Sequence, residues 1–268
     1  EKAQGKVLLC CTTAKSDLKI NVQGFNPNAL PVRTLPVRIE TIEIKHDVAL
    51  LRLALPKAPS FAFYAGQYID LLLPGNISRS YSIANSPDQE GVLELHIRKR
   101  ENGVCSEMIF GAEPKIKEKG IVRVKGPLGT FTLQEDSSKP IILLATGTGY
   151  APIRSILLDL IHQNSERPVH FYWGARQQED LYALEEAEAL IGRLKNAKFS
   201  PVLSKPDSDW KGENGYVQNV AAQNYPDLSQ YEVYACGSPA MTESAQSLLT
   251  QKCALPEDAF FCDAFSPA

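Results

Sequence analysis

The chain has 268 residues, of which 44% are hydrophobic and 22% charged, and its formal net charge is −3. This composition is that of a folded globular protein, and the length predicts two domains, each able to bury its own core. The small net charge excludes a general attraction to nucleic acid or anionic lipid, so local groups must bind any phosphate.

No apolar stretch approaches the roughly 20 residues that span a bilayer, and no secretory leader opens the chain, so we expect a cytoplasmic protein with no membrane partner. The six cysteines show no C-x-x-C pair and no zinc spacing, which predicts reduced thiols. The sequence starts at Glu1 rather than Met. We therefore expect a processed, trimmed or truncated product.

Residues 1–22 form a short segment that ends in alternating polar and apolar residues, and residues 23–34 read as a linker rich in Asn, Pro and Gly. In residues 35–136 apolar side chains recur at spacing two in short runs separated by turns. This pattern predicts a six-stranded antiparallel barrel, interrupted by one short helix at 105–110. The clearest runs are 37–44, 48–55, 67–73, 92–98 and 121–124.

From residue 137 to residue 268 the rhythm changes to alternating strands and helices. Five strands with helical crossovers predict a parallel, doubly wound sheet. The expected strands are 140–145, 169–173, 197–203, 231–236 and 259–262, and the expected helices are 151–163, 181–194, 217–224 and 239–252.

The first of these strands runs into Thr146-Gly147-Thr148-Gly149-Tyr150-Ala151-Pro152, after which a helix begins. Such a turn aims backbone N–H groups and a helix N-terminus at an anion, glycine lets the main chain approach a pyrophosphate, and proline suits the first helical turn. The alternative is a tight turn that binds nothing.

In the barrel region, Arg79-Ser80-Tyr81-Ser82 combines groups that suit a flavin nucleotide. An arginine holds a diphosphate with two donors, a tyrosine covers a flat ring, and a serine hydroxyl bonds a ring nitrogen. Spacing two places Arg79 and Tyr81 on one strand face. The alternative is a half-exposed strand with a surface arginine.

Five motifs in this order resemble those of the ferredoxin–NADP reductase superfamily, over about residues 33 to 268. They lie at residues 79–82, 103–106, 126–131, 147–152 and 236–239. The resemblance implies that Arg79, Ser80, Tyr81 and Ser82 bind FAD. It also implies that His96, Arg98 and the helix start formed by Gly103, Val104, Cys105 and Ser106 lie at the flavin phosphates. A second anion site at this helix start favours FAD over FMN.

The resemblance further implies a nicotinamide nucleotide site. Its members are Gly147, Thr148, Gly149, Pro152, Gly174, Arg176, Cys236, Gly237 and Pro239. The catalytic residues it implies are Ser82, Cys236 and Asp263, and Phe265 would stack on the flavin. Four alternatives stay open: a structural His96, a solvated Arg176, a space-filling Cys236, and a simple last strand at the C-terminus.

The start of the chain resembles the end of a plant-type ferredoxin domain, in which Cys10 would be the fourth ligand of a two-iron two-sulfur cluster. The C-x4-C-x2-C run that supplies the other three thiolates is absent, so such a cluster belongs only to an intact parent. This order of domains resembles the NADH-dependent reductases that serve deoxysugar dehydrases and bacterial ring oxygenases. Residues 95–98 and 105–110 favour the deoxysugar type.

The leading interpretation is therefore an electron-transfer oxidoreductase that moves a hydride from NADH or NADPH to FAD and single electrons to an iron–sulfur centre. The acceptor would be a partner protein or a fused ferredoxin domain. NADH is preferred because residues 204–210 carry Asp207 and Asp209 against Lys205, which disfavours a 2′-phosphate. The alternatives are a stand-alone NAD(P)H-flavin or ferredoxin reductase and a redox-inactive nucleotide-binding regulatory module.

Overall fold

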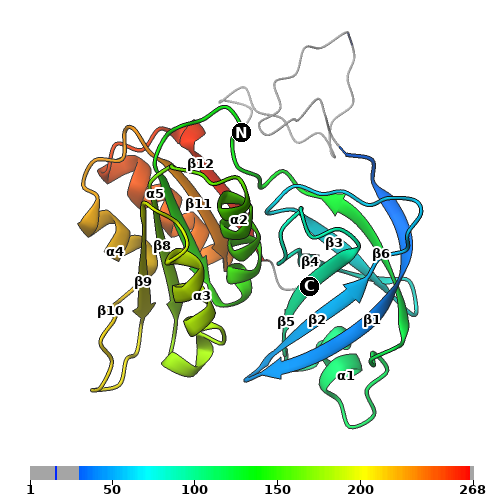
Figure 1. Ribbon diagram of the computed structural model, residues 1–268. Helices are drawn as coiled ribbons and strands as arrows, with labels where there is room; N and C mark the ends of the chain where they lie inside the picture. The colour runs from blue at the N-terminus through cyan, green and yellow to red at the C-terminus, as the bar shows by residue number, and fades with distance from the viewer. Residues whose placement is uncertain (1–15, 17–29, 266–268) are drawn as a thin grey trace.

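A computed structural model of the protein describes Ser16 and residues 30–265. The first six strands form an antiparallel sheet in the order β4-β3-β6-β1-β2-β5, which curls on itself into a barrel (Figure 1). A bridge between Ile83 and Leu95 joins its two edges. The elements are β1 (Arg33–Lys45), β2 (Val48–Ala54), β3 (Tyr68–Leu73), β4 (Ile77–Ser82), β5 (Val92–Arg98), α1 (Val104–Phe110) and β6 (Ile121–Leu128).

The alternation of the sequence explains the barrel interior. In β3, Ile69, Leu71 and Leu73 are buried while the residues between them are half-buried, as expected for a sheet with one face on a core. β1 begins at Arg33, inside the segment expected to be linker, because Arg33 and Thr34 pair with β6.

The second sheet is parallel, with the strand order β10-β9-β8-β7-β11-β12. Its sixth strand, β10 (Glu213–Asn214), was not predicted; it has two residues and therefore no readable period. The other elements are β7 (Ile141–Thr146), α2 (Tyr150–His162), β8 (Val169–Ala175), α3 (Leu184–Ile191), β9 (Ala197–Leu203), α4 (Val217–Asn224), β11 (Glu232–Gly237), α5 (Pro239–Lys252) and β12 (Phe260–Ala264).

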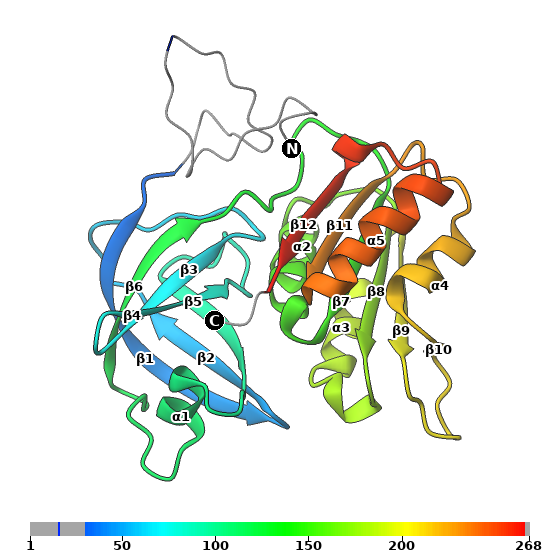
Figure 2. The ribbon, with the colours of Figure 1, turned by 180° about the vertical axis from the view of Figure 1, so that it is seen from behind.

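Helices cover both faces of this sheet, as a doubly wound fold requires. Residues of α2 and α3 share one buried cluster and residues of α4 and α5 share another, and Figure 2 shows α4 and α5 on the face turned away from the barrel. α3 is shorter than the predicted helix 181–194, because Leu181 and Ala183 have non-helical backbone angles and the helix ends at Gly192. No helix among the described residues is long and apolar enough to cross a membrane.

The barrel and the parallel sheet share part of their core. Val48, Ala65 and Phe131 of the first half belong to the same buried cluster as β7 and α2. At the carboxyl end of β7 the chain turns to β8 on one side, while β11 lies on the other. In open parallel sheets such a reversal of strand order opens a crevice that binds ligands.

Candidate active site

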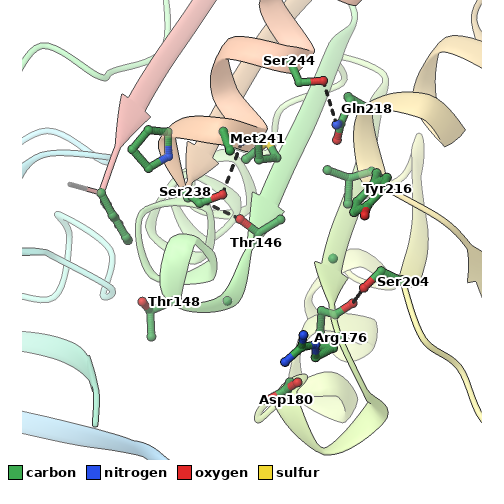
Figure 3. A pocket seen from close by; sticks show the side chains of 18 of the residues that line it. Thr146, Thr148, Arg176, Asp180, Ser204, Tyr216, Gln218, Ser238, Met241 and Ser244 are labelled. Carbon is green, nitrogen blue, oxygen red and sulfur yellow. Dashed lines mark hydrogen bonds between the residues drawn. The ribbon is translucent and has the colours of Figure 1, made fainter. Parts of the chain in front are cut away.

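A cleft of about 940 Å³ lies at the carboxyl ends of the parallel strands. Its size is near the upper end of the range for small-molecule sites, which leaves room for a dinucleotide. Loops after β7, β8, β9 and β11 surround it, and the barrel adds Arg98 and Arg100 (Figure 3). Of the predicted residues, the lining includes Arg98, Gly147, Thr148, Gly174, Arg176, Gly237, Pro239 and Phe265.

The glycine-rich turn after β7 is pressed against the end of β11. A Cβ on Gly149 would lie 2.1 Å from the carbonyl oxygen of Cys236, and one on Gly237, where φ is +148°, would lie 2.1 Å from Thr146 Oγ1. Trp173 Nε1 of β8 donates to the carbonyl oxygen of Gly147 at 3.0 Å and so holds the turn in place. Pro152 is buried in the first turn of α2, as predicted. Only glycine fits at residues 149 and 237, so the turn packs directly on the end of β11, and Gly147, Thr148 and Gly237 line the cleft beside this contact.

The cleft is rich in positive charge. Arg176 is exposed and forms no ion pair within residues 30–265. Arg98 Nε lies 3.2 Å from Asp47 Oδ2, and its Nη2 lies 3.8 Å from Asp180 Oδ1. Guanidinium groups at the rim of such a cleft suit the phosphates of a dinucleotide.

On the barrel side, the structure brings Arg79, Tyr81 and Cys105 together. Arg79 and Tyr81 share one face of β4 and are half-buried, whereas Ser80 is exposed and donates to Asp70 Oδ1 at 2.7 Å. Burial, followed by the neighbouring Cys105, raises the pKa of Tyr81. Tyr81 therefore keeps its phenolic proton.

A second hollow, of about 300 Å³, opens at the start of α1 beside Gly103 and Ser106. Ser106 Oγ accepts a hydrogen bond from the backbone N–H of Arg100 at 2.8 Å. Val104 and Cys105 are in the first turn of α1, with Cys105 buried. The helix start thus borders a hollow, and the Ser106 hydroxyl already holds the preceding turn.

His96 differs from the expectation that it lies beside a phosphate. Its Nδ1 is 2.8 Å from the hydroxyl of Tyr182 and its Nε2 is 3.1 Å from Glu94 Oε1. Burial lowers the pKa of His96, which favours a neutral ring. Both ring nitrogens have protein partners and the residue does not line the cleft, so the geometry favours the structural alternative.

Cys236, Asp263 and Phe265 lie together at the carboxyl ends of β11 and β12. Cys236 and Asp263 are partners in the β11–β12 pairing, and the backbone N–H of Phe265 donates to the carbonyl oxygen of Gly237 at 2.7 Å. Burial raises the pKa of both Cys236 and Asp263. Phe265 lines the cleft.

Tyr68 lies between Ser82 of the barrel and Asp263 of the parallel sheet. Ser82 is buried and is the strand partner of Tyr68. Burial, then Asp70, then Asp263 raise the pKa of Tyr68, so the Asp263 carboxyl is close to the barrel. The Asp263 carboxyl therefore lies near Tyr68, the strand partner of Ser82.

Sequence reasoning missed several cleft residues. Asp180 lines the cleft, whereas Asp207 and Asp209 do not, and the segment 204–210 contributes only Ser204. An acidic residue shortly after the second parallel strand was the available signal for Asp180. The other missed lining residues include Tyr216, Gln218, Ser238 and Ser244, whose side chains Figure 3 shows around the cleft.

Comparisons with known proteins agree with this architecture. An oxidoreductase FAD-binding domain matches residues 37–133, and an oxidoreductase NAD-binding domain matches residues 143–247. The chain is 41% identical to the CDP-6-deoxy-L-threo-D-glycero-4-hexulose-3-dehydrase reductase of Yersinia pestis, over 99% of this chain and 79% of that protein. It is 34% identical to an NAD(P)H-flavin reductase of Vibrio harveyi, over 79% of this chain and 90% of that protein.

Among solved structures, the Amycolatopsis cytochrome P450 reductase GcoB superposes with a TM-score of 0.80 at 30% identity, covering 88% of this chain and 71% of that one. The chain therefore belongs to the ferredoxin–NADP reductase superfamily of FAD- and NAD-binding oxidoreductases. It is an NAD(P)H-dependent flavoprotein reductase of the electron-transfer type.

Proposed function

We propose that this reductase takes a hydride from NADH onto FAD and delivers single electrons to an iron–sulfur centre that serves a partner enzyme, a deoxysugar dehydrase or an oxygenase. The observation that carries the proposal is the relative named as a dehydrase reductase, which aligns along 99% of this chain. A relative named as the reductase component of propane 2-monooxygenase, from Gordonia, is 34% identical and supports the same kind of role.

The residues present fit both nucleotides. A diphosphate suits the guanidinium of Arg79, a flat ring suits Tyr81, and the buried Ser82 hydroxyl would bond a ring nitrogen in a site of low dielectric constant. When bound, FAD converts the two-electron chemistry of a nicotinamide into one-electron transfer. Gly147 and Thr148 of the turn after β7 line the cleft, which supports placing the nicotinamide nucleotide along this turn.

Asp263 supplies the acid–base group of the proposal. Because burial raises its pKa, its carboxyl keeps a proton to a higher pH than an exposed aspartate does. Its strand partner Cys236 is fully buried. This carboxyl would serve as the proton donor or acceptor beside the reaction centre.

The preference for NADH rests on Asp180 rather than on the loop 204–210. A carboxylate that lines the cleft beside Arg176 opposes a 2′-phosphate and accepts a hydrogen bond from a ribose hydroxyl. Arg176, which also lines the cleft, has the opposite effect, because its guanidinium would pair with the 2′-phosphate of NADPH.

The test is anaerobic electron transfer by the purified, FAD-loaded chain. We expect NADH to bleach the flavin absorbance, and the reduced protein to reduce an added plant-type two-iron two-sulfur ferredoxin faster than it reduces free FMN. A flavin that NADH does not bleach contradicts the donor assignment. Faster reduction of free FMN than of ferredoxin favours the second candidate, a stand-alone flavin reductase, which the Vibrio harveyi relative supports.

The third interpretation, a redox-inactive regulatory module, does not fit a chain whose relatives are reductases. We propose domain limits of 35–136 for the FAD-binding part and 137–268 for the nucleotide-binding part. Apart from Ser16, the segment 1–22 with Cys10 lies outside the described residues, as does most of the linker 23–34. The ferredoxin remnant, the cluster of a longer parent and the cytoplasmic location remain predictions.

A further inference from the structure

One half-buried arginine of α2 bonds directly to the barrel. Arg154 lies in the second turn of α2, five residues after Gly149, and its side chain is 13% exposed. Its Nη1 donates to the carbonyl oxygen of Ala84 at 2.7 Å. The next residue, Ser155, donates from Oγ to the carbonyl oxygen of Asn85 at 2.6 Å.

The two acceptors follow closely after the end of β4. Only Ile83 separates Ser82 from Ala84, and Asn85 is fully buried. The chain that would hold the flavin ring is thus bonded, within two or three residues, to the helix that carries the nicotinamide turn. Neither Arg154 nor Ser155 lines the cleft.

Carboxylates from both sides hold the guanidinium in place. Arg154 Nη2 lies 2.8 Å from Glu186 Oε1 of α3, and its Nη1 lies 3.5 Å from Glu94 Oε1 of β5. The backbone N–H of Glu94 donates to Asn85 Oδ1 at 2.8 Å. Arginine is suited to this position because its planar fork meets several acceptors at fixed angles, which a lysine ammonium does not.

Other contacts also join the two parts, among them His96 with Tyr182 and the shared apolar core. The two parts therefore remain associated without Arg154, and what its fork adds is precise alignment. Alignment matters for hydride transfer, because a displacement of about 1 Å between reacting groups costs on the order of 100-fold in rate.

We propose that Arg154 is a positioning residue: by bonding the chain after β4 to α2 it sets the spacing between the flavin ring and the nicotinamide, and hence the rate of hydride transfer, without contacting either cofactor. The inference rests on the proposed placement of the flavin ring at Ser82 and of the nicotinamide nucleotide at Gly149.

The experiment is anaerobic stopped-flow reduction of the FAD-loaded enzyme by NADH, which separates the limiting rate of flavin reduction from the apparent Kd for NADH. For Arg154→Met we expect the limiting rate to fall at least tenfold, with the apparent Kd within threefold of wild type and full flavin occupancy. The charge-transfer absorbance of the nicotinamide–flavin complex should fall as well. Arg154→Lys, which keeps the charge but not the fork, should restore the rate only in part, and Ser155→Ala should lower it less than Arg154→Met does.

Arg193→Met is the matched control, because Arg193 is exposed just beyond α3 and should leave the limiting rate unchanged. A wild-type limiting rate in flavin-loaded Arg154→Met overturns the inference. If that variant does not fold, wild-type rates in both Arg154→Lys and Ser155→Ala overturn it instead. Failure of wild-type enzyme itself to be reduced by NADH contradicts the proposed function and is a distinct result.

Discussion

Gly149 faces the carbonyl oxygen of Cys236 so closely that a Cβ at residue 149 would lie 2.1 Å from that oxygen. The turn after β7 and the end of β11 therefore stay in contact only while residue 149 is glycine. We expect Gly149→Ala to force them apart and to lower kcat/KM for NADH at least tenfold. Gly192→Ala is the control, since the nearest atoms there are 3.5 and 3.6 Å away. Steady-state kinetics with equal flavin content test this, and equal values for the two variants contradict it.

Arg79→Ala should lose flavin. A charge-assisted bond contributes about 1.5 to 3 kcal/mol, so FAD affinity should fall roughly tenfold to a hundredfold. Arg123→Ala removes an exposed arginine from β6 and should leave the affinity unchanged. Titration of the flavin-free proteins with FAD gives the Kd values, and chromatography of heat-released flavin should show FAD and not FMN. Full FAD occupancy in Arg79→Ala argues against this assignment.

Ser82→Ala and Cys236→Ala should slow flavin reduction more than they weaken NADH binding, since we place both at the ring contact. Cys253→Ala is the matched control: Cys253 is also buried, but it belongs to the cluster under α4 and α5. Single-turnover reduction at several NADH concentrations separates rate from binding. Unchanged limiting rates in both Ser82→Ala and Cys236→Ala would mean that the reaction centre lies elsewhere.

The coenzyme ratio should depend on Asp180. We expect kcat/KM for NADH to exceed that for NADPH at least tenfold, about 1.4 kcal/mol, at one fixed ionic strength. Asp180→Asn removes the charge that opposes a 2′-phosphate and should shrink this ratio. Asp209→Asn, an exposed position outside the cleft, should leave it unchanged. If Asp209→Asn changes this ratio more than Asp180→Asn does, the loop 204–210 determines the coenzyme preference instead.

His170 should make the protein less stable in acid. Burial lowers the pKa of His170 from 6.5 to about 4, so between these values the unfolded chain binds a proton that the folded chain does not. The stability contributed by the neutral ring is complete above pH 6.5 and is lost as the pH falls towards 4. Thermal unfolding between pH 7 and 5 should therefore lower the Tm of wild type more than that of His170→Gln. Parallel curves for the two proteins contradict this.

Local sequence patterns predicted the elements and their order, because burial on one or both faces of a strand leaves a period that can be read directly. β5 has the predicted bounds, 92–98, whereas the two-residue β10 has no period to read. Contacts between distant segments leave no such trace. The partners of His96 lie on β5 itself and beyond α2, and Arg154 meets the chain 70 residues before it, so their roles appear only in three dimensions.

The loop residues show the same limit. The charges of Asp207 and Asp209 were visible in the sequence, but the direction in which a loop points them was not, and the cleft receives Asp180 instead. Motifs built from glycine gave the position of the cleft more reliably, since they report where the main chain must pass close to other atoms.

Val48, Ala65 and Phe131 of the barrel pack in the same buried cluster as α2, so the two halves of the chain share one hydrophobic core. If the barrel were exchanged for that of a distant relative, its side chains would not fit this shared core. Arg154 and Ser155 would also meet different residues. Successful chimeras should therefore carry their own Ala84–Asn85 segment and α2 from the same parent. The two sheets therefore evolve as one unit, because they share this core cluster. A substitution on one side of the cluster limits which substitutions the other side tolerates.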